Sequence, residues 1–184
     1  MREILHGILP VALLQEARHD VTAEIERNPG PDFARKGRIR LSWFDSPAIN
    51  AIARRLSAHA GLPFRADRSG AQLQRPGGSH HQGWHQDLPV IGGLVGFTMW
   101  VPLDPIDGTR PTMEFAGEAP AQDNAYEAQG FSTEDMRGVA FMPTVIDRLE
   151  LGDVVIFGPL ELHRTYCDAA MTQPRLSLDL RFLP

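Results

Sequence analysis

The residues best suited to chemistry are a histidine and an aspartate two positions apart, His85 and Asp87. The run around them predicts a strand, and in a strand side chains two positions apart point to the same face. A second histidine, His163, lies far along the chain and could complete a set of three. Two histidines and one carboxylate on one face of a metal, with the opposite face open, are typical of non-haem Fe(II) oxygenases.

The segment that carries His163 fits this interpretation. A Gly-Asp turn at residues 152–153 precedes an apolar run, which predicts a buried strand. A second break at residues 158–159 follows that run, so the imidazole would reach the site from a different strand. Two rival ligands, His80 and His81, follow two glycines and are more typical of a solvated loop.

Arg175 and Ser177 could hold an anion. They alternate with apolar residues in the last predicted strand, which places both on one face. An oxygenase of this kind needs a co-substrate that chelates iron, and 2-oxoglutarate leaves its second carboxylate to be held by the protein. The planar fork of an arginine binds a carboxylate with two hydrogen bonds, and a hydroxyl can add a third. A salt bridge from Arg175 to Asp168 or Asp179 is the structural alternative.

Bulk properties narrow the class of protein. The 184 residues suit one domain, and 42% hydrophobic with 22% charged residues is ordinary for a globular protein. The net charge of −5 gives no general attraction to nucleic acid or to an anionic membrane. Cys167 is the only cysteine, so no internal disulfide can form. Pro10 interrupts the first apolar run, so this run is typical of neither a signal peptide nor a membrane span. Together with the single cysteine, this leads us to expect a cytoplasmic protein.

The elements that must position these residues are helical first and β-rich afterwards. Pro10 can open one helix, which residues 28–31 stop, and Ser46 can cap a second helix that Gly61 ends. Short β-type runs follow between turn residues. The candidate strands are residues 64–67, 71–75, 83–88, 96–102, 112–115, 153–157 and 176–182.

These runs predict one mainly β domain over residues 1–184. Residues 1–61 would form a helical N-terminal part, packed on one sheet of a sandwich or barrel formed by residues 62–184. The polar, glycine-containing segment 118–137 is predicted to be a long loop or lid.

Six segments, in order along residues 70–182, resemble the phytanoyl-CoA dioxygenase family of Fe(II)/2-oxoglutarate-dependent oxygenases. They are Gln-Arg-Pro-Gly at 74–77, Trp-His-Gln-Asp at 84–87, residues 98–104, residues 112–117, Gly-Asp at 152–153 with its strand and His163, and Pro-Arg-Leu-Ser at 174–177. The resemblance implies a double-stranded β-helix, a jelly-roll of the cupin type. It implies His85, Asp87 and His163 as iron ligands. It also implies a co-substrate pocket formed by Arg175, Ser177, Thr98, Trp100 and Gln74.

The activity implied by the resemblance is hydroxylation, or another oxidation, of a C–H bond in a small-molecule substrate. The cofactors would be Fe(II), 2-oxoglutarate and O2, and the co-substrate would leave as succinate and CO2. An aspartate at position 87, where halide-binding variants of such sites have a small residue, disfavours halogenation. Two alternatives stay open: a cupin-like metalloenzyme that uses the same three ligands without 2-oxoglutarate, and a non-catalytic jelly-roll binding protein. The oligomeric state is open as well.

Overall fold

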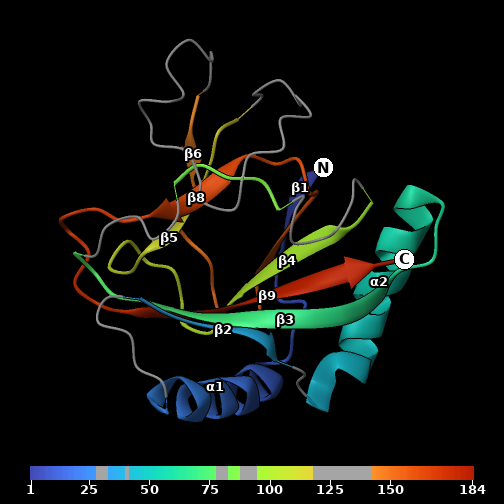
Figure 1. Cartoon of the computed structure of the whole chain (residues 1–184), viewed down its shortest axis with the longest axis horizontal. Helices are drawn as coiled ribbons and strands as arrows, with labels where there is room; N and C mark the ends of the chain where they lie inside the picture. Colours follow the sequence, from blue (N-terminus) through green and yellow to red (C-terminus); the bar gives the residue numbers. More distant parts are fainter. Residues whose placement is uncertain (28–32, 40–41, 78–82, 88–94, 118–141) are drawn as a thin grey trace.

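Nine strands and two α-helices make up the part of the chain that the computed structural model describes, which comprises residues 1–27, 33–39, 42–77, 83–87, 95–117 and 142–184 (Figure 1). In chain order the elements are β1 (Arg2–Leu5), α1 (Val11–Glu26), β2 (Phe33–Ile39), the 3-10 turn η1 (Ser42–Asp45), α2 (Pro47–Ala60), β3 (Arg65–Gln74), β4 (Phe97–Pro102), β5 (Thr112–Phe115), β6 (Thr144–Val145), β7 (Val154–Phe157), β8 (His163–Tyr166) and β9 (Arg175–Leu183).

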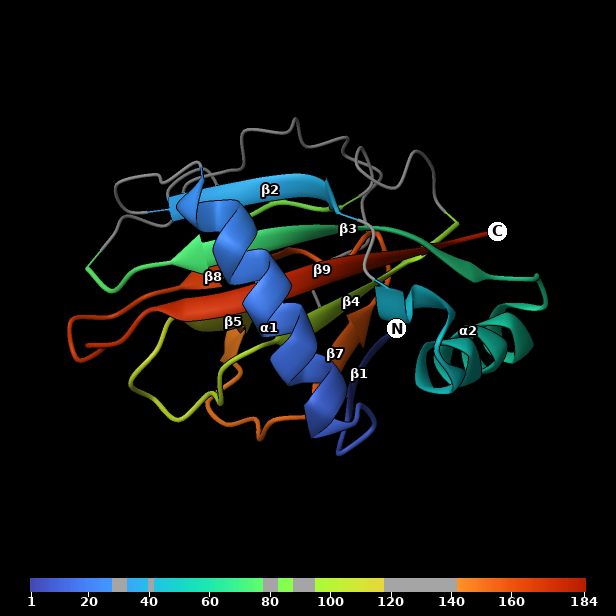
Figure 2. The ribbon, with the colours of Figure 1, turned by 90° about the horizontal axis from the view of Figure 1, so that it is seen from below.

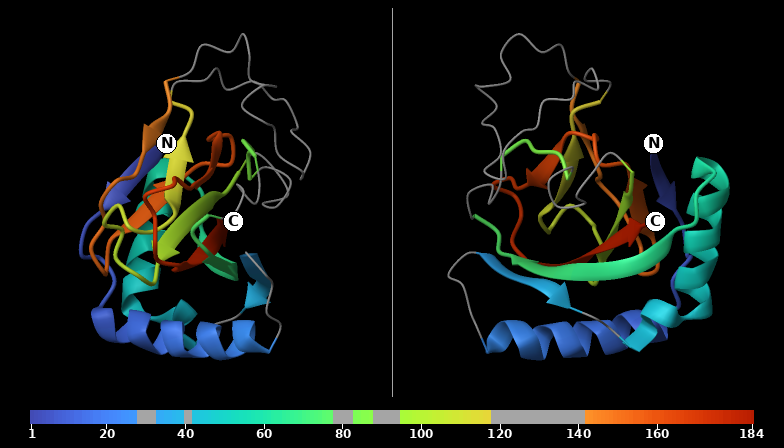
Figure 3. Two further views of the ribbon diagram at one scale, coloured as in Figure 1. Left: turned by 90° about the vertical axis from the view of Figure 1, so that its left-hand side faces the viewer. Right: turned by 45° about the vertical axis from the view of Figure 1, so that its right-hand side comes forward.

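The strands form two antiparallel sheets. The larger sheet has the order β1-β7-β4-β9-β3-β2, and the smaller sheet has the order β6-β5-β8. Figure 3 shows the smaller sheet lying over one face of the larger one. An apolar cluster from both sheets fills part of the space between them: Trp100, Ile106, Met113, Phe115, Ile146, Leu149, Val155 and Phe157.

The two helices cover the other face of the larger sheet. Figure 2 shows α1 crossing that face, with α2 beside it. Alternate residues of β9 supply much of this contact, because Leu176, Leu178, Leu180 and Phe182 all belong to the core that the sheet shares with the helices. Neither helix in the described residues is long and apolar enough to cross a membrane.

Both helices begin as the sequence predicts, and α2 also ends as predicted; α1 ends at Glu26, and its predicted stop at 28–31 lies outside the described residues. In α2 the Ser46 hydroxyl accepts a hydrogen bond from the Ile49 amide at 3.3 Å, and the helix ends at Gly61 with a left-handed φ of 69°. The first helix follows Pro10 directly. Capping residues act through their own side chain and backbone. The sequence alone therefore locates the helix boundaries that such residues form.

The strand predictions need three corrections. The segments 64–67 and 71–75 are one continuous strand, β3, which has an irregularity between Ala66 and Arg68. Residues 83–87, the described part of the predicted strand 83–88, form isolated bridges in place of a strand, and one of these bridges pairs His85 with His163. The N-terminal part is not purely helical, since β1 and β2 form the two edges of the larger sheet.

The unpredicted strands are short or highly charged. The sequence of β2 is Phe-Ala-Arg-Lys-Gly-Arg-Ile, which lacks apolar alternation. Charged residues are common on edge strands because they discourage pairing with another chain, so such strands are poorly signalled by hydrophobic period. The strands β6 and β8 have two and four residues, too few to show a period.

The predicted Gly-Asp turn fastens the N-terminal segment to β7. Gly152 has a φ of 104°, and a Cβ there would lie 2.8 Å from the Leu9 carbonyl oxygen, so only glycine fits. The Asp153 carboxylate accepts hydrogen bonds from the backbone amides of Gly7 at 2.8 Å and Glu150 at 3.0 Å. The motif therefore has a structural role in joining β1 to the strand beside it.

Candidate metal centre and anion pocket

Three potential metal ligands that are distant in sequence lie together between the sheets. One ligand atom from each of His85, Asp87 and His163 lies within 4.8 Å of the others. Paired backbone hydrogen bonds of 3.0 Å join His85 to His163, and the two ring centroids are 4.3 Å apart. Asp87 and His163 are 3% and 4% exposed. The structure thus places side by side the three residues that the sequence pattern selects.

Both imidazoles are oriented by backbone carbonyl groups. The Nδ1 atom of His85 lies 3.0 Å from the Gly83 oxygen, and that of His163 lies 2.8 Å from the Glu161 oxygen. A carbonyl only accepts hydrogen bonds, so Nδ1 carries the proton in each ring and Nε2 keeps its lone pair. Burial lowers the pKa of His85 to about 4 and also lowers the pKa of His163. Both rings are therefore neutral, as metal binding requires.

The Asp87 carboxylate is held on one side by Arg181 and Thr98. Its Oδ2 atom accepts hydrogen bonds from the Thr98 hydroxyl at 2.6 Å and from Arg181 Nη1 at 2.5 Å, whereas Oδ1 is 3.4 Å from Arg181 Nη2. Arg181 also contacts the Thr98 hydroxyl. Burial would raise the pKa of Asp87, but the Arg181 guanidinium holds it well below its usual range. The less engaged Oδ1 atom is the one left for a metal.

Arg181 was not predicted, and Thr98 has a contact that was not predicted, while its co-substrate role stays a prediction. The sequence resemblance assigns Thr98 to the co-substrate pocket, whereas its hydroxyl binds Asp87. A signal for Arg181 exists in the strand period: Arg175 and Ser177 share a face, and the same alternation continues through Asp179 to Arg181. Extending that face to the end of the strand would have identified it.

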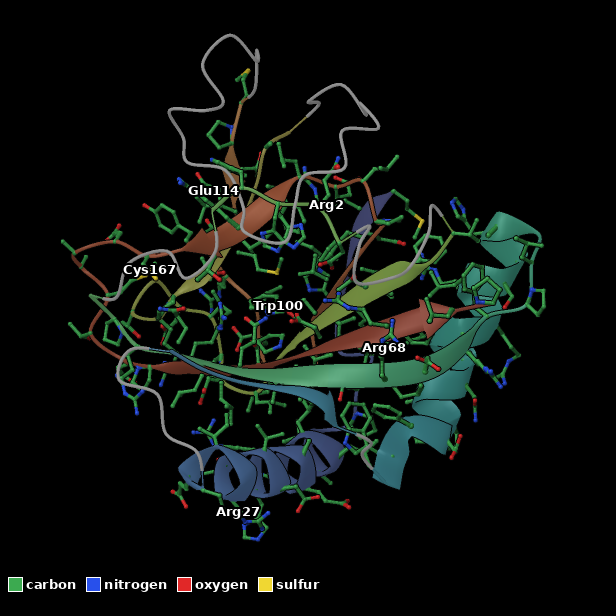
Figure 4. All side chains as sticks on the ribbon, in the orientation of Figure 1. Arg2, Arg27, Arg68, Trp100, Glu114 and Cys167 are labelled. Carbon is green, nitrogen blue, oxygen red and sulfur yellow. The ribbon has the colours of Figure 1, made fainter. Side chains whose placement is uncertain are left out.

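A second arginine, Arg164, lies behind the two histidines. Its Nε atom donates a 2.7 Å hydrogen bond to the buried Glu114 carboxylate, and its guanidinium carbon lies 4.6 Å from the ring centre of Trp84. Trp84 precedes His85 and Arg164 follows His163, so this contact connects the two segments on the side away from the metal ligands. We call Trp84, Arg164 and Glu114 the back clamp; Figure 4 labels Glu114 beside β8.

Arg175 is buried in a pocket whose polar atoms are only partly satisfied. It is 1% exposed, its guanidinium carbon is 5.2 Å from the Trp100 ring centre, and Nη1 is 3.4 Å from the carbonyl oxygens of residues 111 and 112. In the described residues, Arg175 Nε, Ser177 Oγ and Gln74 Oε1 have no hydrogen-bond partner. Figure 4 shows Trp100 between the two sheets. Buried polar atoms without partners are costly, which indicates a ligand site.

The alternative of a structural salt bridge for Arg175 is not what the described residues show. Asp168 accepts hydrogen bonds from the Tyr166 hydroxyl and the Ala170 amide, and Asp179 accepts one from Gln72 at 2.6 Å. Burial lowers the pKa of Arg175 to about 10, which leaves the guanidinium charged at neutral pH. A buried cation without an ion pair among the described residues is suited to an anionic ligand.

Three sequence predictions lie outside the described residues. These are the rival ligands His80 and His81 and the loop or lid at 118–137.

Comparison with solved structures shows the same fold in several proteins, among them alpha-ketoglutarate-dependent enzymes. The non-heme epimerase SnoN from nogalamycin biosynthesis has a TM-score of 0.70 and 16% identity, over 99% of this chain and 78% of that one. AviO1 from Streptomyces viridochromogenes Tue57 has a TM-score of 0.68 and 14% identity, over 100% and 89%. HygX from Streptomyces hygroscopicus, solved with nickel, 2-oxoglutarate and hygromycin B, has a TM-score of 0.59 and 17% identity, over 100% and 82%.

Sequence comparisons give no closer relationship. No protein-family model matches the chain, and no curated protein matches its sequence. The chain therefore shares its fold with alpha-ketoglutarate-dependent enzymes, whereas membership of the phytanoyl-CoA dioxygenase family stays a prediction.

Proposed function

We propose that this protein is an Fe(II)- and 2-oxoglutarate-dependent dioxygenase with a double-stranded β-helix fold, which hydroxylates or otherwise oxidises a C–H bond of a small molecule. The observation that carries the proposal is that the chain holds both parts of such a site. One part is the cluster of His85, Asp87 and His163, and the other is the buried Arg175 with its unused hydrogen-bond donor. A metalloprotein without this co-substrate would need only the first part.

The three clustered residues suit a divalent first-row metal. Two neutral imidazoles and one carboxylate are the ligand set of the facial triad, which keeps open positions for other ligands. His85 and His163 each offer Nε2, and Asp87 offers Oδ1. Backbone carbonyls and Arg181 fix the orientation of the three ligands before a metal binds, as outer-sphere partners usually do.

The pocket around Arg175 suits the distal carboxylate of 2-oxoglutarate. Its Nε atom and the Ser177 hydroxyl can both donate to a carboxylate, whereas Gln74, whose Nε2 already donates to the Arg75 carbonyl, adds only an acceptor, Oε1. The Trp100 ring against the guanidinium keeps water away and fixes the fork. These donors are the ones that the folded chain leaves without partners.

The charges of the site also fit a divalent metal together with a dianion. Besides the histidines, the buried ionisable side chains that the described residues place on the inner faces are Asp87, Asp179, Arg175 and Arg181, two of each sign. With both histidines neutral, their charges cancel. A divalent metal adds two positive charges, and a dicarboxylate removes them again, so the loaded site returns to neutrality. A buried site that ended with a net charge would be much less stable.

When bound, the metal and 2-oxoglutarate supply the activation of O2, and the co-substrate is converted to succinate and CO2. The residues of the chain position the ligands and the co-substrate and shield the site from water. Arg181 and Thr98 direct the Asp87 carboxylate, Arg175 fixes one end of the co-substrate, and the aromatic residues between the sheets exclude water. Hydroxylation is our proposed outcome, and the aspartate at 87 disfavours halide binding.

A small-molecule substrate agrees with the structural neighbours. SnoN was solved with Fe3+, alpha ketoglutarate and nogalamycin RO, and HygX was solved with hygromycin B. The neighbours include an epimerase and a carbocyclase, so the shared fold serves several reaction outcomes. The substrate and outcome must therefore be identified from this chain's own pocket.

The decisive experiment is anaerobic addition of Fe(II) and then 2-oxoglutarate to the purified protein. We expect a visible metal-to-ligand charge-transfer band, because chelation of Fe(II) by the keto acid produces one. His163→Ala should abolish the band. Arg175→Ala should weaken 2-oxoglutarate binding by at least about ten-fold, the loss expected for a charged hydrogen-bond donor. Arg148→Ala, which removes an arginine paired with Glu150 on the surface, is the matched control and should change nothing.

Two results would separate the alternatives. Tight Fe(II) or Zn(II) binding with no charge-transfer band would indicate a metalloprotein that does not use 2-oxoglutarate. A band without O2-dependent release of succinate would indicate a binding protein that has lost turnover.

A further inference from the structure

Arg2 lies on the inner face of the larger sheet, beside the candidate metal centre. It pairs with Phe157 in the β1–β7 register, and directly opposed residues of antiparallel strands point to the same face. Its guanidinium carbon is 4.8 Å from the centre of the Phe115 ring, which in turn lies 5.7 Å from the His163 ring. One aromatic ring thus separates this cation from a metal ligand, and Figure 4 shows Arg2 on the side of β1 that faces β8.

The Arg2 side chain is exposed, and no described residue forms an ion pair or a hydrogen bond with it. Its neighbour Glu3 points to the opposite face and pairs with Arg55 of α2. Among the residues that the structure describes, Arg2 is therefore a solvent-facing positive charge without an ion pair, held over a fully buried aromatic ring at the edge of the site.

Arg2 and Arg175 lie at opposite ends of β5. Arg175 reaches the carbonyl of Thr112, the first residue of that strand, whereas Arg2 covers the last residue, Phe115. Four residues of strand separate the two ends by roughly 10 Å. The two guanidinium groups therefore cannot share one carboxylate. Since the loaded metal site is already neutral, the charge of Arg2 is not needed for the co-substrate.

We propose that Arg2 binds an anionic group of the primary substrate, so that the substrate class is small molecules bearing a carboxylate, phosphate or sulfate. This inference rests on the proposed function, because it places the anion beside a site loaded with metal and 2-oxoglutarate. The planar fork of the guanidinium would hold the anion with two charged hydrogen bonds, while the Phe115 ring fixes the fork from behind. Such an anchor would orient the rest of the substrate toward the open side of the metal.

The test uses inorganic phosphate as the probe and a paramagnetic metal as the detector. The protein is loaded with Co(II) and saturating 2-oxoglutarate, and loading is verified by the visible Co(II) spectrum. The relaxation rate of the phosphate ³¹P signal is then measured and compared with that of the Zn(II)-loaded protein. Phosphate bound at Arg2 is close enough to the metal to relax faster in the Co(II) sample.

We expect the Co(II)-dependent relaxation to fall at least about ten-fold in Arg2→Ala, in line with the loss of a charged hydrogen-bond donor, and to persist in part in Arg2→Lys. Arg54→Ala is the matched control. Arg54 is an exposed arginine of α2, which packs on the other face of the sheet, and it should leave the relaxation unchanged.

Equal relaxation in wild-type and Arg2→Ala protein would overturn the inference, because phosphate would then be bound elsewhere or to the metal. Absence of any Co(II)-dependent relaxation would overturn it as well. Failure of the proposed function is recognised separately, since the Co(II) spectrum would then not respond to 2-oxoglutarate.

Discussion

Replacing Arg164 with methionine should weaken metal binding, although Arg164 is not a ligand. The back clamp joins Trp84, which precedes one histidine ligand, to Arg164, which follows the other. Within the described residues only one pair of backbone hydrogen bonds connects His85 with His163, since no strand forms around His85. The side-chain contact behind them is therefore a main constraint on the separation of the two imidazoles.

The size of the effect follows from the burial of the clamp. The side chains of Arg164 and Glu114 are 15% and 7% exposed, so removal of the arginine leaves a nearly buried carboxylate uncompensated. We expect Arg164→Met to reduce the free energy of unfolding by about 3 kcal/mol, at the lower end for breaking a buried ion pair. Loss of a group bonded directly to a ligand typically weakens metal affinity by about 10–100-fold, and because Arg164 acts through Trp84 we expect the lower end of that range, about ten-fold.

Adding Glu114→Gln to Arg164→Met separates these two effects. The double variant has no uncompensated charge, so most of the lost stability should return, but the contact with Trp84 is still missing and metal affinity should stay low. Urea unfolding of the metal-free protein measures the first quantity, and anaerobic Co(II) titration measures the second. Arg148→Met, which breaks the exposed pair with Glu150, is the control. If Arg164→Met loses stability but binds Co(II) with wild-type affinity, the clamp has no role in positioning the ligands.

Three further predictions concern the ligands and the anion pocket. Arg175→Gln should raise the dissociation constant for 2-oxoglutarate at least about ten-fold, while the Co(II) affinity in anaerobic titration stays within error. If the affinities for 2-oxoglutarate and Co(II) fall equally, Arg175 supports the fold and does not bind the co-substrate. Asp87→Asn should abolish metal binding and lower the free energy of unfolding by about 3–5 kcal/mol in urea, because Arg181 loses its buried partner; unchanged stability would contradict this pairing. Burial depresses the pKa of His85 to about 4 in the folded protein. The unfolded chain therefore binds this proton at a higher pH than the folded chain does, and the free energy of unfolding decreases as the pH falls from about 6.5 toward 4. Between pH 7 and 5 the metal-free protein should lose roughly 1–2 kcal/mol from this group, and His85→Gln should reduce that pH dependence; equal slopes would refute the assignment.

Much of the fold was predictable because local chemistry determines it. Ser46 and Gly61 determine the two ends of α2 through their own hydrogen bonding and backbone conformation. The alternation of apolar and polar residues identifies β9. The edge strand β2 was not predictable, because its charged residues show no apolar period. The bridge at His85 was not predictable either, since it depends on a partner that lies 78 positions away, at His163.

The site was predicted better than the strands that carry it. The spacing of His85 and Asp87 and the later His163 identified a cluster that the structure brings together, although the described residues 83–87 do not form the strand used to argue for it. The ligands are instead held by tertiary contacts. Arg181 donates to Asp87 across 94 positions, and no local pattern around the aspartate indicates that partner.

The last strand explains why the core and the site depend on each other. Its register is fixed twice, by nine residue pairs with β3 and six with β4. Leu178 and Leu180 point to the helices, while Arg175 and Arg181 point between the sheets. Because side chains alternate, a slip of one residue would bury the two arginines among the helices and expose the leucines to the polar pocket. The apolar face of this one strand therefore sets the positions of both the Asp87 partner and the anion anchor, which is why substitutions in this core should alter ligand binding as well as stability.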